Sequence, residues 1–119
     1  MQSLMSENSR CADLIKCAYN LGDLELKTYK ILIEKGPMRY DELSEISQRN
    51  PSSVYRSLQK LMSCGMVYRQ TKNIEGGGYY HLYIAREKQA VKRDLASCVG
   101  EWKSRVDDLL TMFDEELHD

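Results

Sequence analysis

The chain has 119 residues, a formal net charge of −1, and charged and apolar fractions of 29% and 42%. These values are ordinary for a globular protein, and the length fits one domain without a regulatory domain of ordinary size beside it. No apolar run reaches the roughly 18 residues that a membrane-spanning helix needs, and the polar N-terminus lacks the apolar region of a signal peptide. We therefore expect a cytoplasmic protein that does not bind membranes, in which any affinity for nucleic acid must come from the local distribution of charge.

The four cysteines, Cys11, Cys17, Cys64 and Cys98, form no Cys-x-x-Cys pair and have no histidine pair nearby. A zinc site of the usual spacing is therefore not indicated, and the sequence predicts no metal or other cofactor. Each cysteine falls at an apolar position of an expected helix, so we interpret them as small buried thiols in a reducing compartment. Two alternatives stay open: a redox-sensing thiol, for which Cys64 is the best placed, and an iron–sulfur site built from distant cysteines.

Two helices are expected in the first third of the chain, after a flexible segment of residues 1–8. Ser9 can cap the first helix, which breaks around Gly22. The second helix, Leu24–Lys35, is apolar on more than one side, which predicts a buried central helix ended by the Gly-Pro pair that follows. The apolar stripe of the first helix consists of Cys11, Leu14, Ile15, Ala18 and Leu21.

A helix-turn-helix pattern follows. Asp41 is suited to cap a short helix, Asp41–Ser47, in which Leu43 and Ile46 are expected to point inward. After a short connection, a second helix, Pro51–Met62, is expected. Asn50 is suited to cap it, and proline is well tolerated at the first helical position. This order predicts that the second helix is the recognition helix, although an ordinary helical hairpin of a bundle has the same spacing.

The two sides of the helix Pro51–Met62 differ in chemistry. Val54, Leu58, Leu61 and Met62 recur at helical spacing on one side, which is expected to pack. The other side has no carboxylate and carries hydroxyl, amide and cationic groups, which suit phosphates and the acceptor-rich edges of bases. These groups belong to Ser52, Ser53, Arg56, Gln59 and Lys60.

Charge is sorted along the chain. The segment 48–72 has five cations and no acid, whereas the segment 101–119 has seven acids and two cations, a net charge of −5. An acidic run of this kind is typical of a solvated face. The basic segment instead coincides with the predicted helix-turn-helix, which favours an anionic partner.

A β-hairpin is predicted directly after the recognition helix. Met66–Thr71 and Tyr79–Ile84 are rich in residues that favour strands, and the segment between them contains three consecutive glycines. A hairpin in this place is a wing, with Arg69 and Lys72 on its first strand. A phosphate-binding nucleotide loop is not favoured, because the glycines join two strands and no Lys-Ser/Thr follows them.

The C-terminal residues Arg86–Leu117 are predicted to form one long helix. Its apolar residues recur every 3.7 residues or so, close to the period of a straight helix. Because a small domain cannot cover such a stripe, we expect it to meet the same stripe of a second copy, with the first helix as an additional partner. The alternative is a helix folded back on its own domain. The residues expected in the dimer interface are Leu14, Ile15, Leu95, Trp102, Val106, Leu109 and Phe113.

Residues Leu24 to Ile84 resemble the winged helix-turn-helix of archaeal TrmB-like transcriptional regulators and, more loosely, that of MarR-type regulators. The most specific part is Ser-x-Val-Tyr-x-x-Leu-x-x-Leu at residues 52–61, followed by Gly-x-Val at 65–67. The resemblance implies a transcriptional regulator whose recognition helix enters the major groove. Larger TrmB-like regulators carry a C-terminal effector domain that binds sugars. Because this chain ends after one helix, it looks like the short form without that domain, and its effector is unknown.

The sequence thus predicts a mainly α fold with a small β-hairpin: a winged helix-turn-helix with N- and C-terminal dimerisation helices. Its expected parts are residues 1–8, 9–85 and 86–119. The expected function is sequence-specific binding of double-stranded DNA by a homodimer, with Arg56 pairing with guanine. The residues expected at DNA are Arg49, Ser52, Ser53, Tyr55, Arg56, Lys60, Arg69 and Lys72.

The sequence also bears on two other classes of function. A winged-helix adaptor would use the basic segment to bind an acidic protein and would bind duplex DNA only weakly. An enzyme is not indicated, because neither His81 nor His118 has a cysteine, serine or carboxylate at a spacing typical of a catalytic or metal site.

Overall fold

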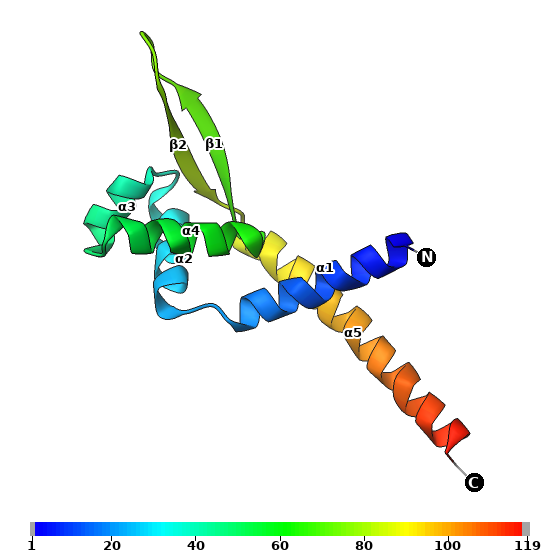
Figure 1. Ribbon diagram of the computed structural model, residues 1–119. Coiled ribbons are helices and arrows are strands. Elements are labelled where there is room, and N and C mark those ends of the chain that lie inside the picture. Colours follow the sequence, from blue (N-terminus) through cyan, green and yellow to red (C-terminus); the bar gives the residue numbers. More distant parts are fainter. Residues whose placement is uncertain (1, 118–119) are drawn as a thin grey trace.

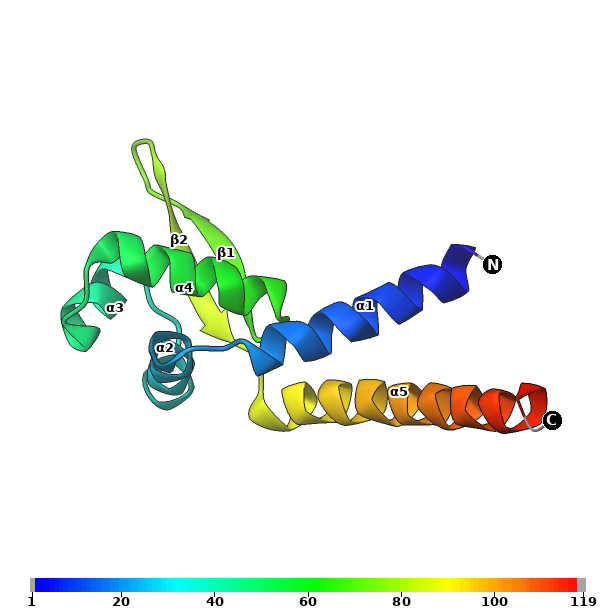
Figure 2. The same cartoon turned by 60° about the horizontal axis from the view of Figure 1, so that its bottom comes forward.

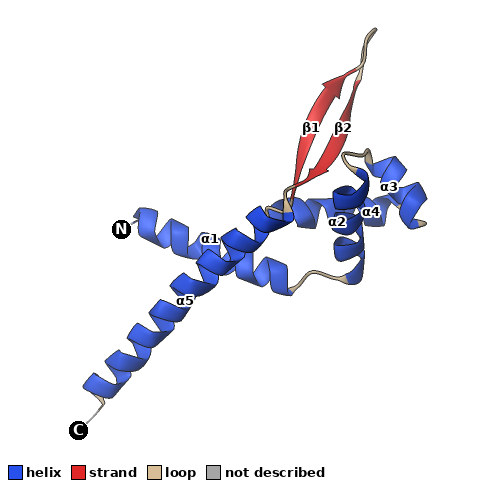
Figure 3. Cartoon of the chain, turned by 180° about the vertical axis from the view of Figure 1, so that it is seen from behind, coloured by secondary structure: helices blue, strands red, loops and turns tan. Residues whose placement is uncertain are grey.

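The computed structural model describes residues 2–117, with side-chain surroundings from Arg10 to Leu117. Five helices and one two-stranded sheet make up this part of the chain, and the hairpin projects from the helical body (Figures 1 and 3). The predicted mainly α, winged helix-turn-helix fold is confirmed. The elements are α1 (Gln2–Tyr19), α2 (Asp23–Lys35), α3 (Tyr40–Ser47), α4 (Pro51–Ser63), β1 (Val67–Asn73), β2 (Tyr79–Ala85) and α5 (Lys88–Glu116).

The helix boundaries differ from the predicted ones at several ends. Helix α1 begins at Gln2, before the Ser9 cap that we expected. Helix α3 begins at Tyr40, and the backbone N–H of Arg39 donates to the Glu42 carboxylate at 3.1 Å, so Asp41 is a first-turn residue and not the cap. The division into residues 1–8, 9–85 and 86–119 stays a prediction, and His118 lies outside the described residues.

The core lies where α2, α3 and α4 meet the base of the hairpin. Leu43, Val54, Leu58 and Leu61 are almost fully buried there, and α2 contributes a buried face of its own. Ile46 was expected to join this core, but 43% of it is exposed. The reason is that α3 turns Ser44 and Ser47 inward beside Leu43, where both serine hydroxyls bond backbone carbonyls. The other members of the buried cluster are Tyr29, Ile31, Leu32, Cys64, Met66, Val67, Tyr83 and Val91, and the residues packed against it are Cys17, Leu21, Met38, Met62, Ala85 and Leu95.

The hairpin is an antiparallel pair in which Val67 faces Ala85 and Asn73 faces Tyr79. A short bridge from Met38 to Tyr83 ties it to the α2–α3 connection, because each of these two residues donates its N–H to the other's carbonyl. The three glycines at the tip have φ values between 86° and 124°, a region that side chains with a Cβ rarely adopt. The predicted Gly-rich turn of the wing is thus confirmed.

Helix α5 runs away from the winged domain, and α1 lies across its first half (Figures 1 and 2). The described chain is consequently elongated, 73 Å along its longest axis. Beyond the reach of α1, the apolar stripe of α5 is uncovered: half of the surface of Trp102 and of Phe113 is exposed. In the single chain, therefore, the helix does not fold back over its own stripe.

The expectation that the cysteines are separate buried thiols is wrong. Cys11 of α1 is bonded to Cys98 of α5, and Cys17 of α1 is bonded to Cys64 at the end of α4. Because the paired cysteines are 87 and 47 residues apart in the sequence, local spacing could not predict these pairs. Among the described residues, no helix is both long and apolar enough to cross a membrane.

Candidate nucleic-acid interface

Helix α4 is set into the domain by its buried side. Val54, Ser57, Leu58 and Leu61 point into the core, and the side-chain oxygen of Asn50 accepts the N–H of Ser52 at 2.8 Å. This contact caps the helix as predicted and satisfies one of the free N–H groups of its first turn. Opposite the buried side, helical geometry places the exposed Ser52, Arg56 and Gln59.

The turn that leads into α4 is tightly bonded. Gln48 adopts a left-handed conformation with φ 56°, and the N–H of Arg49 donates to the carbonyl of Ser44 at 3.2 Å. The Ser44 hydroxyl in turn donates to the carbonyl of Arg49. The side chain of Arg49, which lies in this turn, is exposed. The helix-turn-helix angle is therefore fixed by backbone hydrogen bonds and not only by apolar packing.

Tyr55 lies on the edge of the outer face and is paired with a residue that sequence reasoning missed. Its ring meets the ring of Tyr40 edge to face, with centroids 6.1 Å apart, and both side chains are more than 40% exposed. Together with Pro51, Ser52 and Arg56 they border an open cleft of about 470 Å³. The residues that line the cleft supply a guanidinium, a hydroxyl and two aromatic rings, and none of these residues has a carboxylate.

A second group of aromatic residues joins this surface to the wing. The Arg39 guanidinium lies 4.9 Å from the centre of the Tyr80 ring, a cation–π contact between the start of α3 and β2. Tyr83 is fully buried at the same place, and its hydroxyl has no hydrogen-bond partner among the described residues. Burial raises the pKa of Tyr83, and the charge of Arg69 on the facing strand acts in the opposite direction.

A compositional signal could have revealed this group. Six of the eight tyrosines lie between residues 40 and 83, which is the helix-turn-helix and wing. Aromatic side chains near a basic segment are typical of nucleic-acid surfaces as well as of cores. Five of these six tyrosines line a cavity of about 190 Å³ between α3, α4 and β2, which is formed by Arg39, Tyr40, Tyr55, Tyr79, Tyr80, His81 and Tyr83.

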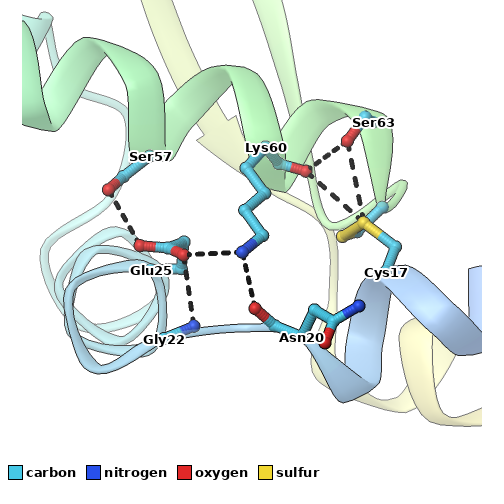
Figure 4. Close-up of polar contacts among 8 residues, drawn as sticks. Cys17, Asn20, Gly22, Glu25, Ser57, Lys60 and Ser63 are labelled. Carbon is cyan, nitrogen blue, oxygen red and sulfur yellow. Dashed lines mark hydrogen bonds and ion pairs between the residues drawn. A yellow bond between two sulfur atoms is a disulfide. The ribbon is translucent and has the colours of Figure 1, made fainter.

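Unlike Arg56, Lys60 is bonded to other parts of the chain. Its ammonium lies 3.3 Å from the Glu25 carboxylate of α2 and donates to the carbonyl of Asn20 at 2.5 Å (Figure 4). Glu25 also accepts the hydroxyl of Ser57 at 3.0 Å and the N–H of Gly22 at 3.1 Å. Lys60 therefore takes part in a partly exposed junction of α4 with α2 and the α1–α2 connection, and its expected contact with DNA stays a prediction.

The protonation of Glu25 follows from this junction. Burial by itself would raise the pKa of the Glu25 carboxyl. The hydrogen bonds from Gly22, Ser57 and Lys60, together with the positive charge of Lys60, outweigh burial and hold that pKa below its ordinary value. Glu25 is consequently ionised at neutral pH and keeps the Lys60 ammonium beside α2.

The remaining predicted contacts divide into two groups. Ser53 is half-buried on the α2 side of α4, where it lines a cleft with Leu24 and Glu25. Arg69 and Lys72 are exposed on β1, opposite Tyr83 and Tyr80 respectively. The structure thus brings together Ser52, Tyr55 and Arg56 around one cleft and puts two cations on the wing. Ser53 and Lys60 line a neighbouring cleft on the α2 side, which Arg56 also borders.

The residues expected in a dimer interface lie on both terminal helices. Leu14, Ile15 and Leu95 are half-buried between α1 and the start of α5. Trp102, Val106, Leu109 and Phe113 follow each other at helical spacing on the uncovered part of α5 and are 44% to 52% exposed. The first group already has neighbours within the chain, whereas about half of the surface of each residue in the second group is left exposed.

Comparisons with known proteins agree with this geometry. The family described as sugar-specific transcriptional regulator TrmB matches residues 15–89, from the end of α1 to the start of α5. Two uncharacterized proteins of Methanocaldococcus jannaschii are each 32% identical to the chain. The match to MJ1503 extends over 89 residues, which are 75% of this chain and 67% of that protein. The match to MJ1082 extends over 103 residues, which are 87% of this chain and 85% of that protein.

Solved structures show the same arrangement of elements. A possible transcriptional regulator from Methanosarcina mazei Go1 has a TM-score of 0.70 at 28% identity, over 87% of this chain and 88% of that one. A MarR-like transcriptional regulator from Thermotoga maritima shares the fold with a TM-score of 0.52 at 19% identity, over 97% and 81% of the two chains. The matched residues 15–89 are more than half of the chain and contain the complete helix-turn-helix and wing. The chain belongs to the TrmB family of transcriptional regulators.

Proposed function

We propose that the chain regulates transcription by binding double-stranded DNA sequence-specifically as a homodimer. The observation that carries this proposal is the outer face of α4, where Ser52, Arg56 and Gln59 are exposed on a helix that contains no Asp or Glu. These side chains supply donors, which suit the acceptors of guanine and adenine in the major groove. Arg56 is the residue best placed to pair with guanine, because a guanidinium can form two parallel hydrogen bonds with its edge.

The wing and the helix-turn-helix supply the backbone contacts in this proposal. Arg69 and Lys72 are exposed on β1, and Arg49 is exposed at the start of α4. All three are cations beside the proposed base-reading surface, where they would neutralise phosphates and set the register of the protein on the duplex. The aromatic pair Tyr40 and Tyr55 would cover sugar or thymine methyl groups at the rim.

The homodimer rests on the uncovered stripe of α5. Trp102, Val106, Leu109 and Phe113 expose large apolar side chains in one row, and such a row on one protein marks an interaction site. The same row on a second copy is self-complementary about a two-fold axis. Such a dimer would present two α4 helices to successive major grooves about 34 Å apart.

Electrophoretic mobility shift of random-sequence duplex DNA tests the proposal against a protein-binding adaptor. We expect binding of random duplex at about 50 mM salt that falls steeply towards about 200 mM, because phosphate contacts release counterions. Arg56→Ala is the test variant, and Lys30→Ala is its matched control, because Lys30 is exposed on α2 away from the proposed surface. Absence of binding at both salt concentrations would favour the adaptor.

A further inference from the structure

Helix α1 is fastened by two disulfides to two different parts of the fold. The Cys11–Cys98 bridge joins it to α5, with a Cα–Cα distance of 5.1 Å, and the Cys17–Cys64 bridge joins it to the C-cap of α4, with 5.6 Å. Both Cα separations are ordinary for disulfides. The first bridge links the two helices that extend from the domain, whereas the second links that pair of helices to the recognition helix.

We propose that Cys17 and Cys64 form a reversible thiol–disulfide site, open to small dithiols, that sets how firmly the recognition helix is held relative to α1 and α5. In the chemical step, a thiolate of the dithiol attacks the Cys64 sulfur, and the Cys17 thiolate leaves. The second thiol of the reagent then resolves the mixed disulfide. Two electrons pass from the dithiol to the bridge, which becomes two thiols, while the reagent becomes a disulfide. An oxidised dithiol reverses the step.

A cavity gives reagents access to the Cys64 end of this bridge. It measures about 670 Å³, lies between α1, the end of α4 and α5, and has Cys64 in its walls, together with Cys11 and Cys98 of the other bridge. Charged side chains, among them Asp94 and Glu101, also line it. Polar walls keep such a space hydrated, so a small water-soluble dithiol can enter it.

The two bridges differ in their electrostatic surroundings. A carboxylate oxygen of Glu101 lies 3.3 Å from the Cys11 sulfur, where it repels an approaching thiolate. The Cys17 sulfur has the neutral hydroxyl of Ser63 at 3.6 Å instead (Figure 4). Because the attacking group is an anion, Cys17–Cys64 is the bridge that opens first, and Cys11–Cys98 the one that persists.

The Cys17–Cys64 bridge acts on the same junction as Lys60. Cys64 ends α4, and one turn earlier Lys60 is bonded to Glu25 and to the carbonyl of Asn20, just after α1 (Figure 4). Opening the bridge removes the covalent link between α1 and the end of α4 and leaves non-covalent contacts such as the bond from Lys60 to the carbonyl of Asn20. The angle of α4 relative to α5 is then less firmly fixed. As a result, the distance between the two recognition helices of a dimer is also less firmly fixed.

A measurable difference in DNA binding follows, and this part rests on the proposed function. A duplex with two half-sites requires both recognition helices at a set distance, whereas a single half-site does not. Reduction of Cys17–Cys64 should weaken binding of the two-half-site duplex about tenfold, within the range usual for coupling between sites. Binding of the single half-site should stay unchanged.

The test uses the full chain, equilibrated with mixtures of reduced and oxidised dithiothreitol. Differential alkylation and mass spectrometry should show Cys17 and Cys64 becoming accessible before Cys11 and Cys98. Amide hydrogen exchange at residues 19–22 and 60–64 should accelerate in the same mixtures. Simultaneous opening of both bridges, other pairings, or equal exchange in both redox states would overturn the proposal, whether or not the chain binds DNA.

Variants connect the bridge to DNA binding. Cys17→Ser should bind the two-half-site duplex as weakly as the reduced protein and should no longer respond to dithiothreitol. Cys11→Ser, which removes the other bridge from the same helix, should retain the tenfold response. Full-site affinity that is equal in the oxidised and reduced forms would refute the coupling. Failure of both forms to bind any duplex would instead refute the proposed function, and hydrogen exchange would still decide the redox site.

Discussion

The Lys60 ammonium of α4 lies 3.3 Å from the Glu25 carboxylate of α2. This pair turns a cation of the recognition helix towards the protein and leaves Arg56 as the cation of the outer face. Because Ser57 and Gly22 bond the same carboxylate, the junction positions α4 as well as neutralising a charge. Lys60 therefore contributes first to the placement of the helix.

Replacement of Glu25 by alanine should destabilise the fold. The change removes the acceptor of three donors, of which the Ser57 hydroxyl belongs to a buried residue. Loss of a partner for a buried donor costs about 1–3 kcal/mol, and the exposed part of the Lys60 contact adds little. Urea unfolding at fixed redox state measures the effect. Glu34→Ala, an exposed acid of the same helix, should be nearly neutral, and equal midpoints for the two variants would contradict this account of the junction.

The contribution of Glu25 should depend on pH in the acid range. Its folded-state pKa lies below the ordinary value of 4.5, so folding favours the ionised form. The resulting stability is complete above pH 4.5 and is lost as the pH falls through the lower folded-state pKa. The difference in unfolding free energy between wild type and Glu25→Gln should therefore shrink below pH 4.5. A difference that stays constant down to pH 3 would argue against an ionised, bonded Glu25.

Arg56→Ala should lower specific affinity and specificity together. An arginine that pairs with guanine contributes about 1–3 kcal/mol, and its loss relaxes the preference at one base pair. Selection of bound sites from a random duplex library, carried out in parallel with wild type and variant, measures both effects. If the two selected sequences and affinities coincide, Arg56 does not read a base.

Lys72→Ala should weaken binding to all duplexes alike. Lys72 is exposed on β1 of the wing, where we place it at a phosphate. Removal of one phosphate contact reduces the slope of log affinity against log salt by about 1 and leaves base preference unchanged. Titrations at several salt concentrations give the slope. A changed base preference would mean that the wing reads sequence and does not only hold the backbone.

Phe113→Asp should dissociate the dimer without unfolding the winged domain. Phe113 is half-exposed at the far end of α5, so a charge there costs the monomer little but would be buried unpaired in a dimer. Sedimentation equilibrium measures the mass. Ser104→Asp, an exposed position on the opposite side of α5, is the matched control and should remain dimeric. Wild type that sediments as a monomer would contradict the proposed interface.

Local sequence features predicted the elements well. Asn50 and Pro51 marked the start of α4, Gly36 the end of α2, and the glycine run the tip of the wing, because each acts through its own backbone or its nearest neighbours. The core face of α4 also followed from apolar spacing alone. Ile46 was assigned wrongly, since spacing in a two-turn helix does not decide between apolar and small polar residues as the buried set.

Contacts between distant residues could not be predicted in this way. Local sequence predicts an unpaired cation at Lys60, whereas in the folded chain Lys60 is paired with Glu25, which lies 35 positions away in the sequence. The cysteine pairs are separated by 87 and 47 residues, and the stacking of Arg39 on Tyr80 joins α3 to the wing. In each case the partner is supplied by tertiary packing, and residue type and local spacing carry no information about it.

In the proposed complex, two copies of α4 read one duplex. Fluorescence anisotropy of the selected duplex and of the same duplex with scrambled half-sites, in moderate salt, tests it most directly. We predict two chains per selected duplex and an affinity at least about a thousandfold above that for the scrambled one, as is usual for specific DNA-binding proteins. Equal affinities for the two duplexes, or one chain bound to each, would contradict it.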